Sequence, residues 1–412
     1  MVSMTPTLRR DDLYTSAPAV KMHGEPAGPA GVAPAAAPPR MPATARAPRP
    51  APPRALPSLG PGEALALLGT PVEDPLAPFS NAPADRTVRC DACAHRCVIR
   101  EGRLGICRVR ENRGGTLVSL VYGEVVAAQV DPMEKKPLFH AYPGQTSLSI
   151  ATAGCNLHCP FCQNWEISQA PRDGLHPVRQ PLPPDAVVRE ALAAGASAIA
   201  YTYVEPTVFL EYALDTARLA RDAGLANVMV TNGYQTPETL ALMAPVIDAA
   251  NVDLKGFSDR FYRRVCGARL EPILESLGEM RRLGTWVEVT TLVIPGENDD
   301  PAELAAAAEW IGRELGPQTP WHLSAFSPSF RWTHVPPTPA AALRAAREIG
   351  RRAGLHHVYL GNIPGDGTTD THCHRCDALL ISRRGYRLVA MKLRDGRCPA
   401  CGTPLAGVGL GA

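Results

Sequence analysis

Three cysteines in the middle of the chain are the residues whose spacing points most directly to chemistry. Cys155, Cys159 and Cys162 follow the spacing C-x3-C-x2-C, and Phe161 directly precedes the third of them. Three thiolates this close can bind three irons of a [4Fe–4S] cluster, and no fourth cysteine is near enough in sequence to bind the last iron. That open iron could bind a small molecule and pass an electron to it. A structural zinc site or three unrelated core thiols are the alternatives.

A second group of cysteines lies upstream, in the spacing C-x2-C-x3-C-x9-C. It comprises Cys90, Cys93, Cys97 and Cys107. A small, loop-rich unit without a hydrophobic core needs a cross-link of this kind to be stable. We therefore predict a metal site here, which either zinc or a second iron–sulfur cluster would fit. His95 lies between these residues, and we expect it beside the metal or at the surface because four thiolates already complete the ligand shell. Five arginines around the site would partly neutralise the thiolates: Arg100, Arg103, Arg108, Arg110 and Arg113.

A third group consists of two C-x2-C pairs near the C-terminus. They are Cys373 with Cys376 and Cys398 with Cys401, separated by 21 residues. This separation slightly exceeds the usual zinc-ribbon window, but the strand-like stretches 378–382 and 386–392 between the pairs suit a ribbon. We therefore predict zinc here, with His372 and His374 as flanking residues. Cys266 stands alone and is expected to be a buried, inert thiol, with a radical or redox thiol as the alternative.

Composition limits the partners and the compartment. The formal net charge is only +2, which gives no electrostatic case for a nucleic-acid or anionic-membrane partner. No apolar run approaches 18 residues, and the N-terminus lacks the apolar segment of a secretory signal. Eleven of the twelve cysteines fall in close groups, which in a reducing compartment favours metals over disulfides. We expect a cytoplasmic protein.

A regular alternation of short apolar stretches and Ala/Leu-rich stretches begins at residue 147. The expected strands are 147–153, 198–203, 227–231, 251–255, 286–294, 322–326 and 357–360. The expected helices are 184–194, 207–223, 237–250, 271–283, 301–315 and 339–353. Several helices begin near a Pro and are followed by a Gly, the usual start and stop signals. The pattern predicts an α/β fold of parallel βαβ units, either an open, partial TIM-like (β/α) barrel or a full one.

Polar residues follow these expected strands at their C-terminal ends, where the reactive groups of α/β barrels lie. The three-cysteine loop follows the first strand. Glu205 follows the second, Asn232 the third, and Asp253 with Lys255 the fourth. We therefore expect these residues to meet at one edge of the sheet. An ion pair between Asp253 and Lys255, and a turn at Asn232, are the simpler alternatives.

The cysteine spacing, Phe161 and the preceding strand resemble the radical S-adenosylmethionine (SAM) superfamily. In that superfamily the open iron chelates the amino and carboxylate groups of SAM, and reductive cleavage of SAM gives a 5′-deoxyadenosyl radical that abstracts hydrogen from a substrate. The resemblance implies a [4Fe–4S] cluster on Cys155, Cys159 and Cys162, SAM as cofactor, and a reductant such as flavodoxin or ferredoxin. Phe161 would lie near the adenine.

The resemblance also suggests SAM contacts. Glu205 stands where the superfamily commonly has Gly-Gly-Glu-Pro, a segment that holds the SAM ammonium, although the sequence here is Tyr-Val-Glu-Pro. The triplet Asp253-Leu-Lys255 resembles one in glycyl-radical activating enzymes, where it reaches the ribose and the carboxylate. Asn232 offers a donor and an acceptor to the ribose or the substrate.

A narrower resemblance covers residues 90 to about 405. It is to the radical SAM protein of the AmmeMemoRadiSam system, which is related to pyruvate formate-lyase activating enzymes. The motifs that carry it are residues 90–97, 105–113, 131–140, 151–156 and 161–169. The main hypothesis is a radical SAM enzyme whose substrate is unidentified, with a protein as the candidate substrate class. A glycyl-radical enzyme activase and a catalytically idle, metal-stabilised partner-binding module are the alternatives.

The domain organisation follows from these groups. Residues 1–84 hold 18 of the 42 prolines and are expected to be a disordered arm. Residues 85–140 would form the N-terminal four-cysteine unit, with short strands at 117–122 and 125–130. Residues 141–365 would form the radical SAM core, and residues 366–412 the zinc-ribbon-like unit.

Overall fold

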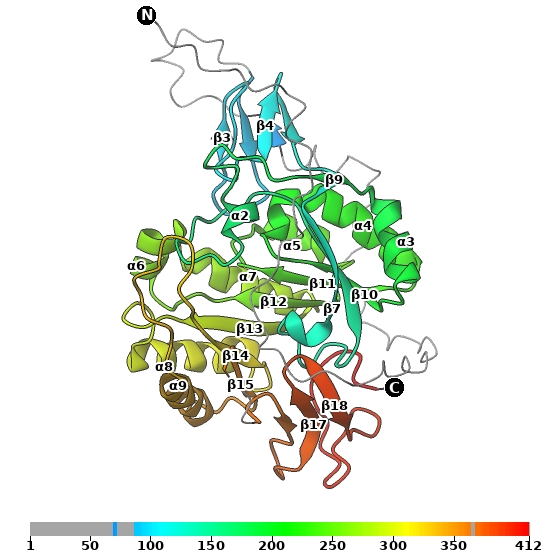
Figure 1. Cartoon of the computed structure of the whole chain (residues 1–412), viewed down its shortest axis with the longest axis vertical. Coiled ribbons are helices and arrows are strands. Elements are labelled where there is room, and N and C mark those ends of the chain that lie inside the picture. Colours follow the sequence, from blue (N-terminus) through cyan, green and yellow to red (C-terminus); the bar gives the residue numbers. More distant parts are fainter. Residues whose placement is uncertain (1–68, 72–85, 364–366, 412) are drawn as a thin grey trace, which may run out of the picture. The chain divides into compact units, whose positions relative to one another are not determined.

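The computed structural model describes residues 69–71, 86–363 and 367–411 (Figure 1). The chain divides into two compact units, Met1–Pro42 and Ala43–Ala412. The first unit lies outside the described residues, and so does the arm expected over residues 1–84, apart from 69–71. All of the described residues belong to the second unit.

Within the described residues, the second unit is built on an eight-stranded sheet in the order β15-β14-β13-β12-β11-β10-β8-β7. All neighbours from β8 to β15 pair in parallel, whereas β7 pairs antiparallel with β8. The strands are β7 (Ala127–Pro132), β8 (Thr146–Ala151), β10 (Ala198–Tyr201), β11 (Ala226–Thr231), β12 (Ala249–Asp253), β13 (Trp286–Val293), β14 (Trp321–Ala325) and β15 (Val358–Gly361).

The sheet does not close. In the part of the chain that the structure describes, β7 and β15 are its two edges and do not pair with each other. Of the two architectures expected from the sequence, the full barrel is therefore wrong. The direction of β7 contributes to this, because it runs antiparallel to its neighbour and adds no further parallel βα unit.

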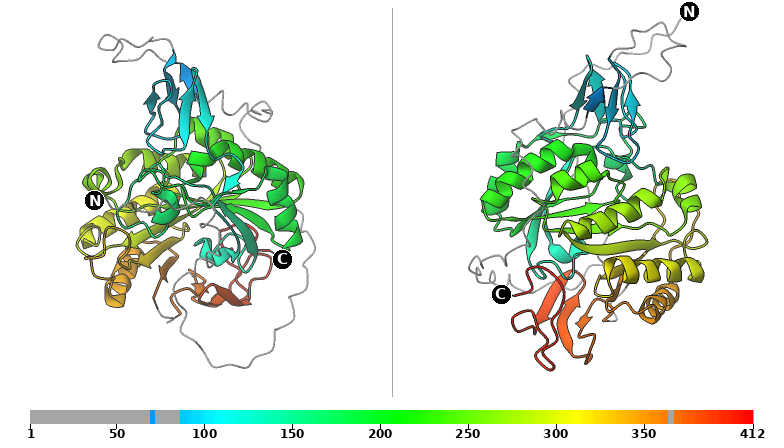
Figure 2. Two further views of the ribbon diagram at one scale, coloured as in Figure 1. Left: turned by 45° about the horizontal axis from the view of Figure 1, so that its top comes forward. Right: turned by 180° about the vertical axis from the view of Figure 1, so that it is seen from behind.

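The main helices cover the outer face of the sheet (Figures 1 and 2). They are α3 (Pro184–Ala193), α4 (Leu210–Asp222), α5 (Pro237–Met243), α7 (Glu271–Arg282), α8 (Pro301–Trp310) and α9 (Ala340–Arg352). Pro occupies the first turn of α3, α5, α7 and α8, as the start signals predicted. The helix expected over 237–250 ends earlier, at Met243, because residues 249–250 already belong to the buried strand β12.

The inner face of the sheet is covered by the segment 133–142 rather than by a helix layer. This segment begins with the 3-10 turn η3 (Met133–Lys135), and Met133 and Leu138 pack on small inner-face residues of β10 to β12. These are Ala198, Ala200, Ala226, Val228 and Ala249. Their short side chains leave the room that the segment fills, because protein interiors are close-packed.

Two small β units flank the large sheet. At the N-terminal end, β1 (Gly69–Pro71), β2 (Val88–Cys90) and β3 (Val98–Ile99) form one sheet, and β4 (Arg110–Arg113) pairs with β5 (Thr116–Ser119). The strand expected over 117–122 corresponds to β5, and the one over 125–130 is divided between β6 (Glu124–Val125) and β7. At the C-terminal end, β16 (Thr371–His372), β17 (Leu379–Arg384) and β18 (Arg387–Met391) form the third sheet.

The C-terminal unit is anchored to the segment on the inner face. Buried Arg383 donates a hydrogen bond to the carbonyl of Phe139 at 2.7 Å and lies 3.5 Å from the carboxylate of Glu134. The hydroxyls of Tyr359 on β15 and Thr371 are 2.8 Å apart. The unit therefore joins edge strand β15 to the segment that follows edge strand β7.

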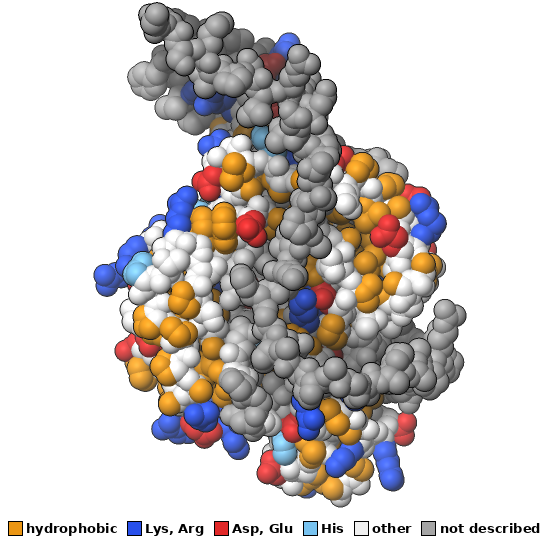
Figure 3. Space-filling model, in the orientation of Figure 1, with side chains coloured by type: hydrophobic (Ala, Val, Ile, Leu, Met, Phe, Trp, Pro, Cys, Tyr) orange, Lys and Arg blue, Asp and Glu red, His pale blue; other side chains and the backbone are white. Residues whose placement is uncertain are grey.

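None of the described helices is long and apolar enough to cross a membrane. On the face shown in Figure 3, acidic and basic side chains are interspersed over the described surface, in keeping with the small net charge.

Candidate functional site

The three-cysteine loop leaves the C-terminal end of β8 through a glycine that the packing requires. Gly154 has φ +97°, and a Cβ at this position would lie 2.8 Å from Val109 Cγ1 and 3.0 Å from the carbonyl oxygen of Cys107. Any other residue would be strained and would clash. The loop then runs through Cys155 and Cys162 and ends in the short helix α2 (Trp165–Ser168).

The three thiols are held in a largely buried environment with few donors. The Leu157 N–H donates to Cys155 Sγ at 3.4 Å, and Cys162 Sγ lies 3.2 Å from Ser168 Oγ. Burial raises the pKa of the Cys155 and Cys162 thiols; Cys159 raises both further, and Cys162 also raises that of Cys155. The loop therefore needs a bound cation or nearby positive charge to hold three thiolates.

Positive charge reaches the loop from Lys255, which follows β12. Its ammonium is 2.9 Å from the Asp253 carboxylate. Burial alone would lower the pKa of Lys255, but Asp253 and Cys159 raise it well above its ordinary value. Asn298 Nδ2 donates to the Lys255 carbonyl at 2.6 Å and so holds this segment in place. The predicted residues Asp253 and Lys255 thus form a half-buried ion pair, and the charge of Lys255 acts on Cys159.

Glu205 is fully buried and ties the ends of β10 and β11 together. Its carboxylate accepts hydrogen bonds from the Thr207 N–H (3.1 Å), the Asn232 N–H (2.7 Å) and the hydroxyls of Thr207 and Thr231 (2.5 and 2.8 Å). Burial raises the pKa of this carboxyl, and these donors act in the opposite direction. Most of the acceptor capacity of Glu205 is therefore used by the chain itself.

Asn232 lies next to Cys155. Its Nδ2 donates to Asn156 Oδ1 at 2.7 Å and points to Cys155 Sγ at 3.9 Å, while its Oδ1 accepts from the Tyr234 N–H at 2.9 Å. The side chain therefore links the end of β11 to the cysteine loop. The turn expected at this position is also present, since Gly233 has φ +70°.

Phe161 is buried on the other side of the loop. Its ring centroid is 5.3 Å from that of Trp332 and 6.4 Å from that of Phe261. Phe161 is thus packed among aromatic rings, and the adenine expected near it stays a prediction.

The lone Cys266 lies closer to the loop than its position in the sequence indicated. It is fully buried, as expected, and its thiol forms a hydrogen bond with Cys159 that raises the pKa of the Cys159 thiol, as burial also does. Its carbonyl accepts from the His158 N–H at 3.1 Å. Only the fold brings Cys266 here, at the end of the π-helical turn η5 (Tyr262–Cys266).

The upstream cysteines line one cavity. Cys90, Cys93, Cys97 and Cys107 surround it, together with His95 and Arg110. His95 is half-buried rather than free at the surface: its Nε2 is 2.9 Å from the Asn156 carbonyl, and its ring packs on Tyr234 at 4.8 Å. The four-cysteine unit is therefore in direct contact with the three-cysteine loop.

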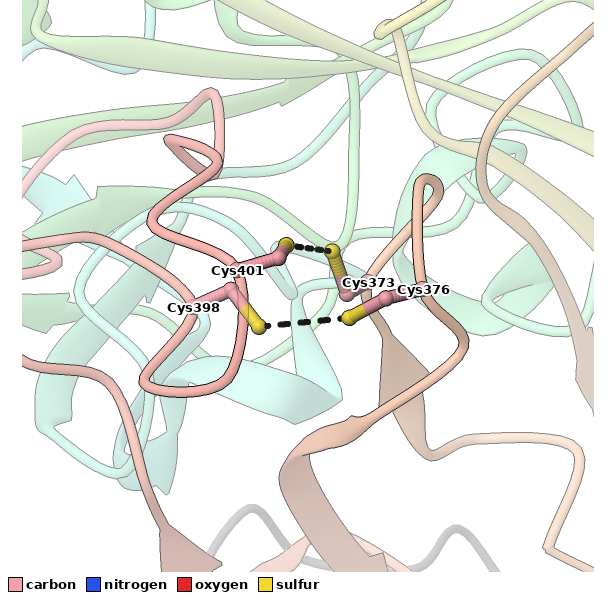
Figure 4. Close-up of side chains that lie close together, drawn as sticks. All are labelled: Cys373, Cys376, Cys398 and Cys401. Carbon is pink, nitrogen blue, oxygen red and sulfur yellow. Dashed lines mark hydrogen bonds between the residues drawn. The ribbon is translucent and has the colours of Figure 1, made fainter.

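The C-terminal cysteines converge tightly (Figure 4). The sulfurs of Cys373 and Cys401 are 3.6 Å apart, as are those of Cys376 and Cys398. All four sulfurs lie within 4.8 Å of one another. Four thiolates at about 2.3 Å from a tetrahedral zinc ion would be about 3.8 Å apart, so this set has the size of a zinc site.

Two arginines near the cysteines, buried Arg110 and half-buried Arg172, were not identified from the sequence as specific contacts. Arg110 forms a two-bond ion pair with Glu211 of α4, at 2.6 and 2.9 Å. Arg172 donates to the carbonyls of Cys155 and Asn156, at 3.2 and 3.5 Å. The sequence carries no local sign of the ion pair between Arg110 and Glu211, because the two residues are 101 positions apart.

Comparisons with known proteins agree with this geometry. The profile of the Radical SAM superfamily matches residues 149–308. An uncharacterised protein of Methanocaldococcus jannaschii is 44% identical over 320 residues, which are 77% of this chain and 95% of that protein. The benzylsuccinate synthase activating enzyme of Thauera aromatica is 24% identical over 256 residues, which are 57% of this chain and 76% of that enzyme.

Among solved structures, a domain of pyruvate-formate lyase-activating enzyme from Bacteroides vulgatus is 16% identical, with a TM-score of 0.36. The match covers 40% of this chain and 100% of that domain. The chain belongs to the radical SAM superfamily, as its profile match and its relatives show. The predicted class, a radical SAM enzyme, is thereby confirmed, and the family implies a [4Fe–4S] cluster and SAM.

The residues at the C-terminal edge of the sheet fit such a cluster. The donor set is three thiols with no carboxylate or imidazole among them. Within the described residues, only the C-terminal cysteines form a set of three or more potential ligands that all lie within 4.8 Å. The three loop cysteines are not in that set, and a cluster does not require them to converge on one point, because each thiolate binds a separate iron.

Proposed function

We propose that Cys155, Cys159 and Cys162 each bind one iron of a [4Fe–4S] cluster and that SAM binds the fourth. When bound, this cluster supplies the electron that splits SAM into methionine and a 5′-deoxyadenosyl radical, which abstracts a hydrogen atom from the substrate. The observation that carries the proposal is the convergence, beside one cysteine loop, of the polar ends of β10, β11 and β12.

The protein side chains have distinct parts in this proposal. Lys255 balances the charge of the thiolates, and with Asp253 it offers an ion pair that could exchange for the carboxylate and ribose of SAM. Asn232 would orient the ribose or the substrate next to Cys155. Glu205 keeps the ends of β10 and β11 in register, and we propose that its remaining acceptor capacity receives the SAM ammonium. Phe161 with Trp332 would pack beside the adenine.

The substrate class follows less directly from the site. We propose a protein substrate, because several relatives are named as activating enzymes of other enzymes, one of them of a glycyl-radical enzyme. Within this class, the motifs from residue 90 onward favour a radical SAM protein of the AmmeMemoRadiSam type. Activation of a glycyl-radical enzyme is the second candidate, which the triplet Asp253-Leu-Lys255 favours. The electron would come from a flavodoxin or a ferredoxin.

Zinc is the metal that we propose for the C-terminal site. The two S···S distances of 3.6 Å match a tetrahedral Zn–thiolate set, and the four cysteines come from two loops that a bound ion would tie together. Arg383 of the same unit donates to the Phe139 carbonyl in the segment 133–142, so zinc would also stabilise this segment on the inner face of the sheet.

Binding of SAM to the cluster can be tested by spectroscopy. Anaerobically reconstituted protein should show the electron paramagnetic resonance signal of a reduced [4Fe–4S] cluster, and this signal should change when SAM is added. Cys159→Ala should lose the SAM-dependent change. Cys266→Ala, which alters the thiol next to Cys159, is the matched control and should keep it. A signal that SAM does not alter in fully loaded wild-type protein would contradict the proposed site.

The substrate class can be tested separately. A peptide that carries deuterated glycine in a glycyl-radical loop should yield deuterated 5′-deoxyadenosine if the protein is an activase. Turnover of SAM without any deuterium transfer from this peptide would exclude the activase and leave the other protein substrates.

A further inference from the structure

The four N-terminal cysteines line one cavity, but their ligand atoms do not gather as closely as those of the C-terminal set. A tetrahedral zinc holds its four sulfurs about 3.8 Å apart. The sulfurs of the C-terminal cysteines all lie within 4.8 Å of one another, and within residues 69–71, 86–363 and 367–411 no other group of His, Cys, Asp or Glu side chains gathers in this way. Cys90, Cys93, Cys97 and Cys107 nevertheless line one common cavity. The same chain therefore contains a compact four-thiol site and a wide one.

A cluster suits the wide site better than an ion does. In a [4Fe–4S] cluster each thiolate binds a different iron, so the four ligands surround a larger object. Within the described residues, the thiols of the three-cysteine loop, which would hold the cluster of the superfamily, do not form such a compact group either. The four-cysteine cavity thus resembles the loop and differs from the C-terminal site.

A buried hydrogen-bond donor lining the cavity has no partner. Arg110 is 2% exposed and lines the cavity together with the cysteines. Its two terminal nitrogens are bound to Glu211 and to the Thr207 carbonyl, but its Nε–H has no acceptor. An unpaired buried N–H costs about 1–3 kcal/mol. A sulfur of a bound cluster would supply the missing acceptor, and the positive charge of Arg110 acts on Cys90 and Cys107.

The cavity also adjoins the three-cysteine loop. The Cys107 carbonyl would be 3.0 Å from a Cβ on Gly154, the residue before Cys155. His95, which lines the cavity, is 2.9 Å from the Asn156 carbonyl. The charge of Arg172 acts on both Cys155 and Cys107. The backbones of the two cysteine-bearing segments are therefore in contact.

We propose that Cys90, Cys93, Cys97 and Cys107 hold a second [4Fe–4S] cluster with no open iron, and that Arg110 Nε–H donates a hydrogen bond to one of its sulfurs. With four protein ligands the cluster binds no substrate and serves electron transfer. A low-potential flavin or iron–sulfur carrier gives it one electron, and the same electron leaves toward the Cys155 loop, which restores the oxidised cluster. Only this transfer rests on the proposed function; the identity of the cluster does not.

Metal analysis of matched variants tests the identity. Wild-type protein purified without oxygen should contain about eight irons and eight sulfides per chain, together with one zinc, if each cluster has four irons. Changing Cys155, Cys159 and Cys162 to Ala should leave about four irons, and Cys90→Ala with Cys93→Ala should also leave about four. Two zinc ions per chain, and no iron in the variant without the Cys155 loop, would overturn the proposal.

The same measurements separate this inference from the proposed function. If the Cys155 loop holds no cluster, the wild type will contain about four irons, all lost in the Cys90/Cys93 variant. The cluster on the four N-terminal cysteines would then be present although the Cys155 loop binds none. Circular dichroism of each variant should match the wild type, and a variant that fails this check is replaced by the corresponding Cys→Ser variant.

Arg110→Lys tests the hydrogen bond. It keeps the positive charge but removes the Nε–H, and since a donor to the sulfurs stabilises the more negative, reduced cluster, its loss should lower the reduction potential. The potential is measured by redox titration in the background that lacks the Cys155 loop, where one cluster is present. Arg103→Lys, on the exposed surface of the same unit, should leave the potential unchanged. An unchanged potential in Arg110→Lys, with full iron content, would refute the assigned donor.

Discussion

Replacement of Glu205 by Gln should destabilise the fold even in the absence of SAM. The carboxylate receives donors from both backbone and side chains at the ends of β10 and β11. Gln has nearly the same shape, but one of its two terminal atoms is a donor. Whichever way the amide is turned, its NH2 group therefore faces either the Thr207 N–H or the Asn232 N–H.

The magnitude follows from these contacts. One buried backbone N–H loses its acceptor, which costs about 1–3 kcal/mol. The remaining bonds lose the additional strength that a charged acceptor gives. We therefore expect the free energy of unfolding to fall by about 2–4 kcal/mol. The Thr207 and Asn232 segments should shift as well, so affinity for SAM should also weaken.

The assay compares chemical denaturation of Glu205→Gln, wild type and Glu166→Gln at equal iron and zinc content, without SAM. Glu166 is an exposed carboxylate on α2, so its amide should change stability by less than about 0.5 kcal/mol. If Glu205→Gln is as stable as Glu166→Gln, the carboxylate does not hold the strand ends together. If Glu205→Gln loses affinity for SAM without losing stability, the carboxylate contributes to SAM binding and not to the stability of the fold.

Three further predictions follow from other parts of the structure. Cys266→Ala should keep the wild-type iron content, because the thiol contacts Cys159 without being required as an iron ligand. Loss of about four irons per chain, the content of one [4Fe–4S] cluster, would contradict this. Burial would raise the pKa of Asp131, but hydrogen bonds from Lys135, Lys136 and Tyr203 lower it to about 2. The ionised carboxylate should therefore stabilise the fold by about 2 kcal/mol at neutral pH. This contribution should disappear as the pH falls from about 4 to about 2. Acid titration of unfolding should show this loss in wild type but not in Asp131→Asn. Cys398→Ala should lose zinc and expose residues 371–391 to hydrogen exchange, while iron content stays unchanged; retention of zinc would contradict the assigned site.

The elements of the core could be predicted because their signals are local. Apolar strands of four to eight residues alternate with helices that begin at Pro and end before Gly, and the structure follows that rhythm from β8 to β15. The gathering of Glu205, Asn232, Asp253 and Lys255 at one edge followed from the parallel order of the strands. Parallel order in turn followed from the helical crossovers.

Other features depend on contacts between distant residues and left no local signal. The antiparallel edge strand β7 and the packing of segment 133–142 on the alanines of β10 to β12 belong to this group. The contact of Cys266 with Cys159 and the pair of Arg110 with Glu211 do so as well. Since each depends on tertiary packing rather than on spacing or periodicity, a single sequence could not reveal it.

The most direct test of the central claim is the formation of 5′-deoxyadenosine. Reconstituted protein, reduced with dithionite under anaerobic conditions and supplied with SAM, should release 5′-deoxyadenosine and methionine in equal amounts. Cys155→Ala should release neither, and Cys266→Ala should resemble the wild type. Wild-type protein with a fully occupied cluster on the Cys155 loop that yields no 5′-deoxyadenosine would contradict the account.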